Sequence, residues 1–215
     1  MVEHISVMRD RCVELLSPLI SISENPVIVD ATLGLGGHTE ALLKRFSNLT
    51  VIAIDRDLDA IRKATVRLSE FGSRLKIAHK TFDEISQVVH GFGYSRIDGA
   101  LFDLGISSMQ IDQSERGFSY SQNAPLDMRM DRTQLLTAAD IVNTYEPGKL
   151  VRILKIYGEE KFASRIVRSI VKQRDIEPIK STTQLAALVK EAIPAATRRT
   201  GGNPAKRTFQ AHFLK

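Results

Sequence analysis

The sequence predicts an α/β protein in which a parallel, doubly wound sheet carries an inserted set of helices. Three observations lead to this fold class. Short apolar runs alternate with helix-like segments from residue 27 to residue 103, and such alternation is typical of parallel sheets. A glycine-rich turn follows the first apolar run. Beyond about residue 110, helical patterns follow one another without a further β-run.

The individual elements follow from apolar periodicity. Four strands are expected over residues 27–29, 51–55, 75–79 and 97–103. The helices expected before and between them cover residues 6–20, 39–46, 58–71 and 85–89. An irregular loop is expected over 106–133. The helices expected after it cover residues 138–143, 147–157, 158–173 and 181–193, the last opening on the capping box Ser181-Thr-Thr-Gln184.

The composition is that of an ordinary globular protein of one domain with an insertion. The chain has 215 residues, of which 43% are hydrophobic and 26% are charged. The single cysteine, Cys12, excludes an internal disulfide and favours a reducing compartment. No apolar run is long enough to span a bilayer, and the first residues lack a secretion signal. We therefore expect a cytoplasmic protein with no membrane partner.

Charge is distributed unevenly along the chain. Residues 1–105 hold 12 Lys+Arg and 14 Asp+Glu, a net charge of −2, whereas residues 106–215 hold 18 and 11, a net charge of +7. A basic half beside a slightly acidic half suggests a polyanionic substrate such as nucleic acid. The alternative is a solvated basic surface with no ligand.

The glycine turn after the first strand is the first candidate binding element. Asp30 ends the strand, and glycines follow at positions 34, 36 and 37. The dinucleotide fingerprint G-x-G-x-x-G fails because Thr39 stands where the third small residue should be. A strand-end carboxylate beside a G-x-G-G turn suits the ammonium and sulfonium groups of S-adenosylmethionine better. The alternative is a strand–turn–helix corner that binds nothing.

Three more candidates follow the other strands. Asp55 lies 18 residues beyond Gly37, where an acid can bind both ribose hydroxyls of a nucleoside. Its alternative role is a helix N-cap, which Asp57 could fill as well. Phe82 could pack beside an adenine or belong to the core, and Asp103 ends the fourth strand. Because ligands of parallel sheets lie at the carboxyl ends of the strands, these residues are expected to meet at one edge.

Long sequence motifs then indicate a family. The chain resembles the RsmH (MraW) family over nearly its whole length. The motifs that carry the resemblance are Asp30-Ala-Thr-Leu-Gly-Leu-Gly-Gly-His38, Asp98-Gly-Ala-Leu-Phe-Asp-Leu-Gly-Ile-Ser-Ser-Met-Gln-Ile-Asp112, Glu115-Arg-Gly-Phe-Ser119, Pro125-Leu-Asp-Met-Arg-Met-Asp131, Thr137-Ala-Ala-Asp140 with Asn143, Tyr157-Gly-Glu-Glu160 and Arg207-Thr-Phe-Gln-Ala211. The start, His4-Ile-Ser-Val-Met8, is similar to that family's H-x-P-V, with Ser6 where proline is usual.

The resemblance implies a Rossmann-like class I S-adenosylmethionine-dependent methyltransferase with an inserted helical domain. The implied substrate is N4 of one cytidine in the decoding region of 16S ribosomal RNA, within the small ribosomal subunit. A homodimer is kept open, and no metal site is expected. The family's cofactor contacts fall on Gly36, Gly37, His38, Asp55, Phe82, Asp103 and Gln110.

Methyl transfer to a cytosine amine is expected to need an acceptor for one N–H, because the nitrogen lone pair is delocalised into the ring. Asp103, or a backbone carbonyl of Leu104 or Gly105, is the candidate. The base must leave its stack, and Phe118 or Tyr120 could hold it.

Basic and acidic residues of the irregular loop and the C-terminal stretch are the candidate RNA contacts. Arg116, Asp127, Arg129 and Asp131 could bind the flipped base and phosphates, or could pair with one another and close the loop. The phosphate candidates without a nearby acid are Arg198, Arg199, Lys206 and Arg207.

The C-terminus departs from the family. After Ala211 the chain reads His-Phe-Leu-Lys215, whereas the family continues into further helices and strands. We expect a C-terminally truncated chain whose last strands are missing, leaving the fourth strand as an open edge. The expected division is 1–108 for the first part of the methyltransferase domain, 109–200 for the inserted substrate-recognition domain, and 201–215 for a truncated return to the first domain.

The alternatives are an inactive RNA- or cofactor-binding remnant, a methyltransferase acting on another nucleic acid or on protein, and a dinucleotide-dependent oxidoreductase. The failed third glycine makes the oxidoreductase the weakest of them.

Overall fold

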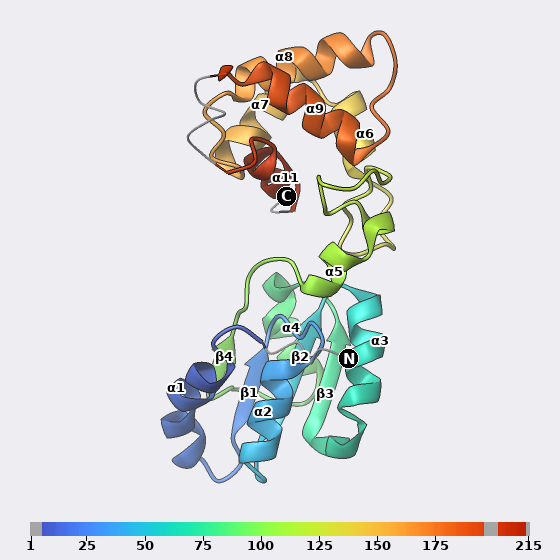
Figure 1. The fold of residues 1–215 in the computed structure, drawn as a ribbon. Coiled ribbons are helices and arrows are strands. Elements are labelled where there is room, and N and C mark those ends of the chain that lie inside the picture. Colours follow the sequence, from blue (N-terminus) through green and yellow to red (C-terminus); the bar gives the residue numbers. More distant parts are fainter. Residues whose placement is uncertain (1–5, 196–201, 214–215) are drawn as a thin grey trace. The chain divides into compact units, whose positions relative to one another are not determined.

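The structure is a computed structural model that describes residues 6–195 and 202–213. The chain divides into two compact units, Met1–Leu104 and Gly105–Lys215 (Figure 1). The buried apolar clusters lie within one unit or the other and share no residue. Among the described residues, no helix is both long and apolar enough to cross a membrane.

The first unit alternates helices and strands as the sequence predicts. Its helices are α1 (Arg9–Ser21), α2 (Gly37–Arg45), α3 (Leu58–Arg67) and α4 (Ile85–Gly91), with short 3-10 turns at Ser69–Arg74 and Phe82–Glu84. Its strands are β1 (Val27–Asp30), β2 (Thr50–Asp55), β3 (Leu75–His79) and β4 (Gly99–Leu101).

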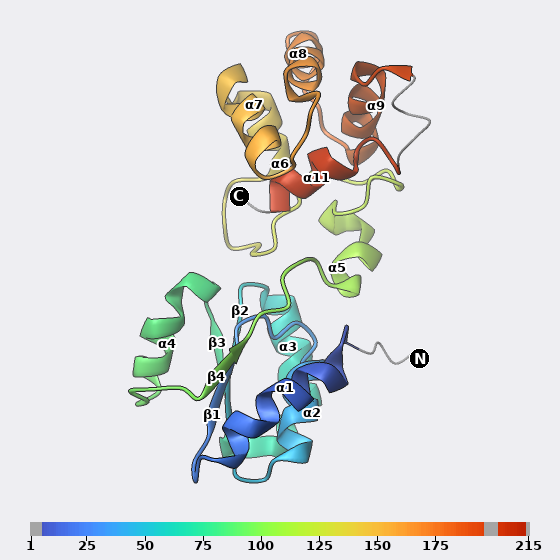
Figure 2. The ribbon, with the colours of Figure 1, turned by 90° about the vertical axis from the view of Figure 1, so that its left-hand side faces the viewer.

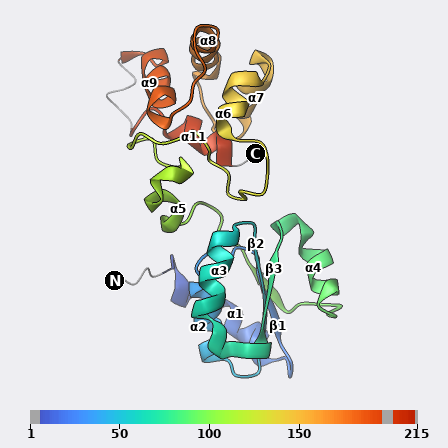
Figure 3. The same cartoon turned by 90° about the vertical axis from the view of Figure 1, so that its right-hand side faces the viewer.

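The four strands form one parallel sheet in the order β3-β2-β1-β4. Helices α1, α2 and α3 cover one face and α4 covers the other (Figures 2 and 3). Successive residues of β1 face opposite sides, so Ile28 packs towards α1 and α2 while Val27 and Val29 pack towards α4. The predicted Rossmann-like, doubly wound arrangement is confirmed.

The fourth strand is shorter than expected, covering Gly99–Leu101 instead of residues 97–103. It pairs only with β1 within the described residues. Asp98 stands just before it, where the carboxylate Oδ2 accepts the Val27 N–H at 2.7 Å. That side-chain bond fastens the start of β1 alongside a backbone bond, in which the Asp98 N–H donates to Val27 O at 2.8 Å.

The second unit is helical, as expected for the residues after the loop. Its helices are α5 (Ser108–Asp112), α6 (Ala138–Thr144), α7 (Pro147–Ile156), α8 (Ala163–Arg174), α9 (Thr182–Ala192) and α11 (Lys206–Phe213), with a 3-10 turn at Ser114–Arg116. One apolar cluster, which includes Val142, Ile166, Leu185 and Phe209, joins α6, α8, α9 and α11.

The segment expected to be an irregular loop, 106–133, is mostly irregular but contains α5 and the 3-10 turn at Ser114–Arg116. Its far end is tied to the start of α9. Leu126 N–H donates to Lys180 O at 3.0 Å, and Thr182 N–H donates to Ala124 O at 3.0 Å. The segment is therefore an integral, hydrogen-bonded part of the second unit.

Helix α8 begins at Ala163, five residues later than the expected start at residue 158. Gly158 is enclosed by backbone, because an added Cβ would lie 2.5 Å from Arg207 O and 2.9 Å from Leu154 O. Glu159 adopts a left-handed φ of 48°, which a helix interior does not accept. Residues 158–162 therefore form a turn between α7 and α8.

The division of the chain also differs from the expected one. The units meet at Leu104 and Gly105, four residues before the expected boundary at 108. Residues 206–213 form helix α11, which packs against α7 of the second unit. Apolar packing explains this placement, because Phe209 and Ala211 are buried in the cluster of the second unit. The expected return of residues 201–215 to the first domain is therefore not seen in the described part of that stretch.

Candidate functional site

The carboxyl ends of the strands are joined through the turn that follows β1. The Gly34 N–H donates to Asp55 Oδ2 at 2.7 Å, which connects this turn to the end of β2. The Asp103 N–H donates to Thr32 Oγ1 at 2.7 Å, which connects it to the segment after β4. The predicted meeting of Asp55 and Asp103 at one sheet edge is thus seen, with the glycine turn between them.

Asp55 is half-buried at the end of β2, and its carboxylate accepts backbone N–H groups. Its Oδ1 accepts the Asp57 N–H at 2.8 Å and its Oδ2 accepts the Gly34 N–H. Burial raises the pKa of Asp55, and these bonds offset only part of that rise. The N-cap of α3 is Asp57, which accepts the Asp59 N–H at 3.0 Å. Asp55 is therefore not that cap, and lone pairs remain on its oxygens for a ligand.

Asp30 has a structural role instead of the ligand-facing one considered from sequence. Its side chain has no exposed surface. Oδ2 accepts the Thr39 hydroxyl at 2.7 Å and Oδ1 accepts the Thr32 N–H at 3.2 Å. Burial raises the pKa of Asp30 above its ordinary value, and the Thr39 bond counteracts only part of this. Asp30 holds β1, the turn and α2 together from within.

Packing accounts for two of the predicted cofactor glycines. Gly36 has a φ of 81°, and an added Cβ would lie 2.6 Å from Leu68 Cδ1. A Cβ on Gly37 would collide with Ser6 Oγ. Both positions require glycine for the close approach of chain segments, so their glycines do not by themselves indicate a ligand.

His38 is buried at the start of α2 and holds the N-terminal segment. Its Nε2 lies 3.0 Å from the Val7 carbonyl oxygen, so this nitrogen carries the proton in that bond. The resemblance predicts a cofactor contact here. The bond to Val7 is a second role that sequence reasoning missed, and the distance of 31 residues between the partners gave no local signal.

Phe82 and Asp103 offer exposed surface at the same edge. Phe82 opens the 3-10 turn after β3, is 46% exposed and meets Phe102 edge-on, with ring centroids 6.1 Å apart. Asp103 is exposed, and its main chain is fixed by Thr32. An exposed aromatic face and an exposed carboxylate on an ordered backbone are suited to stacking and to accepting a donor.

Gln110, the last predicted cofactor contact, belongs to the second unit. Its side chain completes a capping box with Ser107: Gln110 Oε1 accepts the Ser107 N–H at 3.0 Å. The residue is buried. Its contacts in the structure therefore include holding the start of α5.

Two of the predicted RNA contacts are buried. Arg116 is only 1% exposed, and its Nη2 donates to the carbonyls of Arg129 and Met130 at 2.9 Å each. Phe118 is 3% exposed in the apolar cluster, with the Arg116 guanidinium 5.5 Å from its ring centroid. Both side chains fasten the 116–130 segment internally, so neither presents a surface to RNA.

Asp127 and Arg129 pair with each other, which is the closing role weighed for them from sequence. Arg129 Nε donates to Asp127 Oδ1 at 2.7 Å and Nη2 donates to Oδ2 at 2.8 Å. Partial burial raises the pKa of Asp127, but the Arg129 bonds lower it more, so the pKa lies below its ordinary value. An arginine held by two bonds to a carboxylate is largely neutralised, so Arg129 is a poor contact for an RNA phosphate.

This pair should make the second unit acid-sensitive. Since the folded pKa of Asp127 is depressed, its contribution is present above the unfolded pKa of about 4 and is lost as the pH falls through the folded value. Asp127→Asn should cost about 1–3 kcal/mol at neutral pH. Urea unfolding across pH should show the variant and the parent chain converging in acid. The control Glu177→Gln changes an exposed acid. If it lowered the free energy of unfolding at neutral pH as much as Asp127→Asn does, the stabilising role of the Asp127–Arg129 pair would be contradicted.

The C-terminal phosphate candidates are only partly described. Arg198 and Arg199 lie outside the described residues. Lys206 and Arg207 open α11 and are exposed. Arg207 Nη1 donates to the Glu159 carbonyl at 3.4 Å, so it has a partner at the α7–α8 turn. Lys206 remains a candidate phosphate contact.

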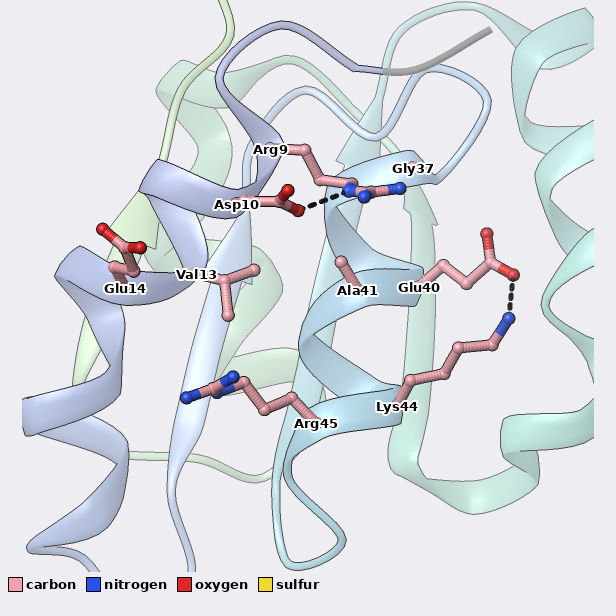
Figure 4. A pocket seen from close by; sticks show the side chains of 9 residues that line it. All are labelled: Arg9, Asp10, Val13, Glu14, Gly37, Glu40, Ala41, Lys44 and Arg45. Atoms are coloured by element: carbon pink, nitrogen blue, oxygen red, sulfur yellow. Dashed lines mark hydrogen bonds and ion pairs between the residues drawn. The ribbon is translucent and has the colours of Figure 1, made fainter. Parts of the chain in front are cut away.

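A groove of about 530 Å³ lies between α1 and α2, and its lining includes Gly37 at the start of α2 (Figure 4). Its walls carry both charges: Lys44 pairs with Glu40 at 2.7 Å, and Arg9 pairs with Asp10 at 2.9 Å. The floor includes Val13 and Ala41. Because its charged groups largely satisfy each other, the groove has no evident ligand chemistry.

Comparison with known proteins adds a family match. The model of the MraW methylase family matches residues 1–213. "Ribosomal RNA small subunit methyltransferase H" of Streptomyces avermitilis is 51% identical over 208 residues, which cover 97% of this chain and 65% of that protein. The proteins of the same name from Thermobifida fusca and Mycolicibacterium smegmatis are 52% and 54% identical and are covered to 63% and 57%. The chain thus spans somewhat less than two thirds of the length of these relatives.

Proposed function

Because this chain belongs to the MraW methylase family, we propose that it is a methyltransferase that uses S-adenosylmethionine to methylate small-subunit ribosomal RNA. The proposed target is N4 of a cytidine in the decoding region of 16S RNA, presented in the small ribosomal subunit. The relatives' names support a small-subunit RNA substrate. The cytoplasmic location and the homodimer remain predictions.

The observation that carries the proposal is the convergence of polar groups at the carboxyl edge of the sheet. Asp55 and Asp103, from β2 and the segment after β4, are both bonded to the turn after β1. Ligands of open parallel sheets bind outside the carboxyl ends of the strands. The fold therefore supplies two carboxylates at the place where a nucleoside cofactor would bind.

These residues fit the chemistry of S-adenosylmethionine. Asp55 has lone pairs left to accept the ribose hydroxyls, and Phe82 has an exposed ring for the adenine. When bound, the cofactor supplies a methyl group already activated by its sulfonium. The main task of the protein is then to align donor and acceptor and to exclude water.

Asp103 is the proposed hydrogen-bond acceptor for the cytosine amine. Its carboxylate is exposed, while the bond from its own N–H to Thr32 fixes the main chain. By accepting one amine N–H, a carboxylate would polarise that bond and help localise the nitrogen lone pair for attack on the methyl group. The backbone carbonyls of Leu104 and Gly105 are the alternative acceptors.

Two measurements test the proposal on the chain as it exists. Calorimetric titration with S-adenosylmethionine should show one site, and methyl transfer from radiolabelled cofactor should modify small subunits at a cytidine N4. Absence of cofactor binding would contradict the proposal and favour an RNA-binding remnant. Transfer to free RNA, DNA or protein but not to small subunits would assign another substrate.

Asp55→Ala should weaken cofactor binding by about 100-fold, because two hydrogen bonds to a charged acceptor are lost at about 1.5 kcal/mol each. Calorimetry measures the dissociation constant, and thermal unfolding reports whether the turn survives. Asp55→Asn keeps one acceptor oxygen and should lose less. The control Glu70→Ala removes an exposed acid just before β3, at the opposite end of the sheet, and an equal loss there would refute the role of Asp55.

A further inference from the structure

The outward faces of α7 and α8 carry an unusual concentration of positive charge. Residues 147–174 hold eight Lys and Arg but only two acids, Glu159 and Glu160. Glu160 is buried and accepts the Phe162 N–H at 2.9 Å. The negative charge within this stretch thus does little to neutralise the helices on either side of the turn.

The basic residues are arranged as two rows pointing away from the core. On α8 the buried residues include Ile166 and Ile170, and the exposed cations recur with helical spacing on the opposite side. The same holds on α7, whose buried residues include Leu150 and Leu154. The six exposed residues of the two rows, here termed the α7–α8 basic face, are Lys149, Arg152, Lys155, Arg165, Arg168 and Lys172.

The two helices that carry the rows lie beside each other. Helices α7 and α8 pack together, and Figures 1 and 2 show them as neighbours. Packed helix axes are about 8–10 Å apart. The row from Arg165 to Lys172 is about 10 Å long at 1.5 Å per residue. The face therefore has room to contact several phosphates at once.

The pairing of these cations differs from that of several bases in the first unit. Exposed bases there that have acidic partners include those of the pairs Arg11–Glu14, Arg62–Asp59 and Lys80–Glu84. Among the described residues, none of the six cations of the α7–α8 basic face forms an ion pair with a carboxylate. Lys149 instead lies 4.0 Å from the Tyr145 ring centroid. A face of like charges without internal neutralisation is complementary to a polyanion.

The chemistry of the face favours RNA over an acidic protein. Protein interfaces have an apolar, aromatic centre and are depleted in lysine. Here three of the six residues are lysines, and the exposed large apolar side chains on α7, Ile156 with the neighbouring Tyr157, lie at its C-terminal end. Arginine and lysine rows without an apolar centre are typical of contacts to a phosphate backbone.

We propose that the α7–α8 basic face binds the phosphate backbone of the RNA substrate without reading its sequence. This inference rests on the proposed function, because RNA is the polyanion which that function supplies. The face would fix the register of the RNA, while base selection takes place elsewhere.

The test measures binding of a short fluorescent RNA duplex of arbitrary sequence by anisotropy at several KCl concentrations. The variant Arg165→Gln/Arg168→Gln/Lys172→Gln should raise the dissociation constant roughly 10-fold or more at low salt and reduce the salt slope by about 2–3. The variant Lys149→Gln/Arg152→Gln/Lys155→Gln should act in the same direction. All six side chains are exposed, so unfolding temperatures should remain unchanged.

The matched control is Arg45→Gln/Lys63→Gln/Arg96→Gln, which removes the same charge from exposed sites of the first unit. It should change affinity only slightly. Equal losses in control and face variants, or no loss in either face variant, would overturn the inference. So would loss of polyglutamate binding with RNA binding retained, which would assign the face to an acidic protein. Titration with S-adenosylmethionine is a separate test. Absence of cofactor binding would contradict the proposed function, while the RNA measurements would still decide whether the face binds phosphate.

Discussion

Asp103→Ala is expected to slow methyl transfer by about 100–1,000-fold, the loss that follows removal of one preorganised hydrogen-bonding group from an active site. The variant removes the carboxylate proposed to accept the amine N–H. The main chain should persist, because the N–H of residue 103 still donates to Thr32. Single-turnover transfer at saturating cofactor separates this effect from weakened cofactor binding.

Two further variants sharpen this test. Asp103→Asn keeps an oxygen acceptor without the charge and should fall between the parent chain and the alanine variant. Glu70→Ala, an exposed site at the other end of the sheet, should leave transfer unchanged. If Asp103→Ala turns over at the parent rate with cofactor bound, the acceptor is a backbone carbonyl of Leu104 or Gly105.

Gly117→Ala should destabilise the second unit by about 2–5 kcal/mol, since backbone strain and overpacking each cost about 1–3 kcal/mol. Gly117 has a φ of 72° and ends the 3-10 turn at Ser114–Arg116. An added Cβ would collide with the Pro125 carbonyl oxygen and lie 3.1 Å from the Asp127 nitrogen. Urea unfolding followed by circular dichroism measures the loss.

Gly148→Ala is the matched control for this prediction. An added Cβ there meets no atom within 4 Å, and position 148 lies in the first turn of α7. Alanine should be neutral or stabilise by up to about 1 kcal/mol. Equal stability of the two variants would show that the 116–128 segment rearranges to accept a side chain at position 117.

The sheet could be predicted from sequence because buried parallel strands are short continuous apolar runs. The runs at Val27–Asp30 and Thr50–Asp55 therefore begin and end within a residue of expectation. The start of α8 could not, because helix periodicity continues through Gly158 and Glu159. The Arg207 carbonyl, 49 residues away in sequence, approaches Gly158 too closely for a side chain at that position, and Glu159 takes a left-handed φ.

Residues of the candidate site could be predicted where their position at the end of a strand determines their location. They could not be predicted where tertiary packing determines their role. Asp55 and Asp103 follow strands, so topology brings them to one edge. Arg116 and Phe118 stand in a polar, irregular stretch, and composition cannot show that both are buried. Gly36 was predicted to contact the cofactor, yet a Cβ added at this position would lie closest to Leu68. Only tertiary contacts separate these roles.

The brevity of β4 has a consequence for solubility. A border strand with one bare side can recruit further strands and seed fibrous assemblies. Within the described residues β4 offers only Gly99–Leu101 for such recruitment, fewer rungs than a lasting intermolecular ladder needs. The same shortness thus limits strand recruitment at the β4 border of the sheet.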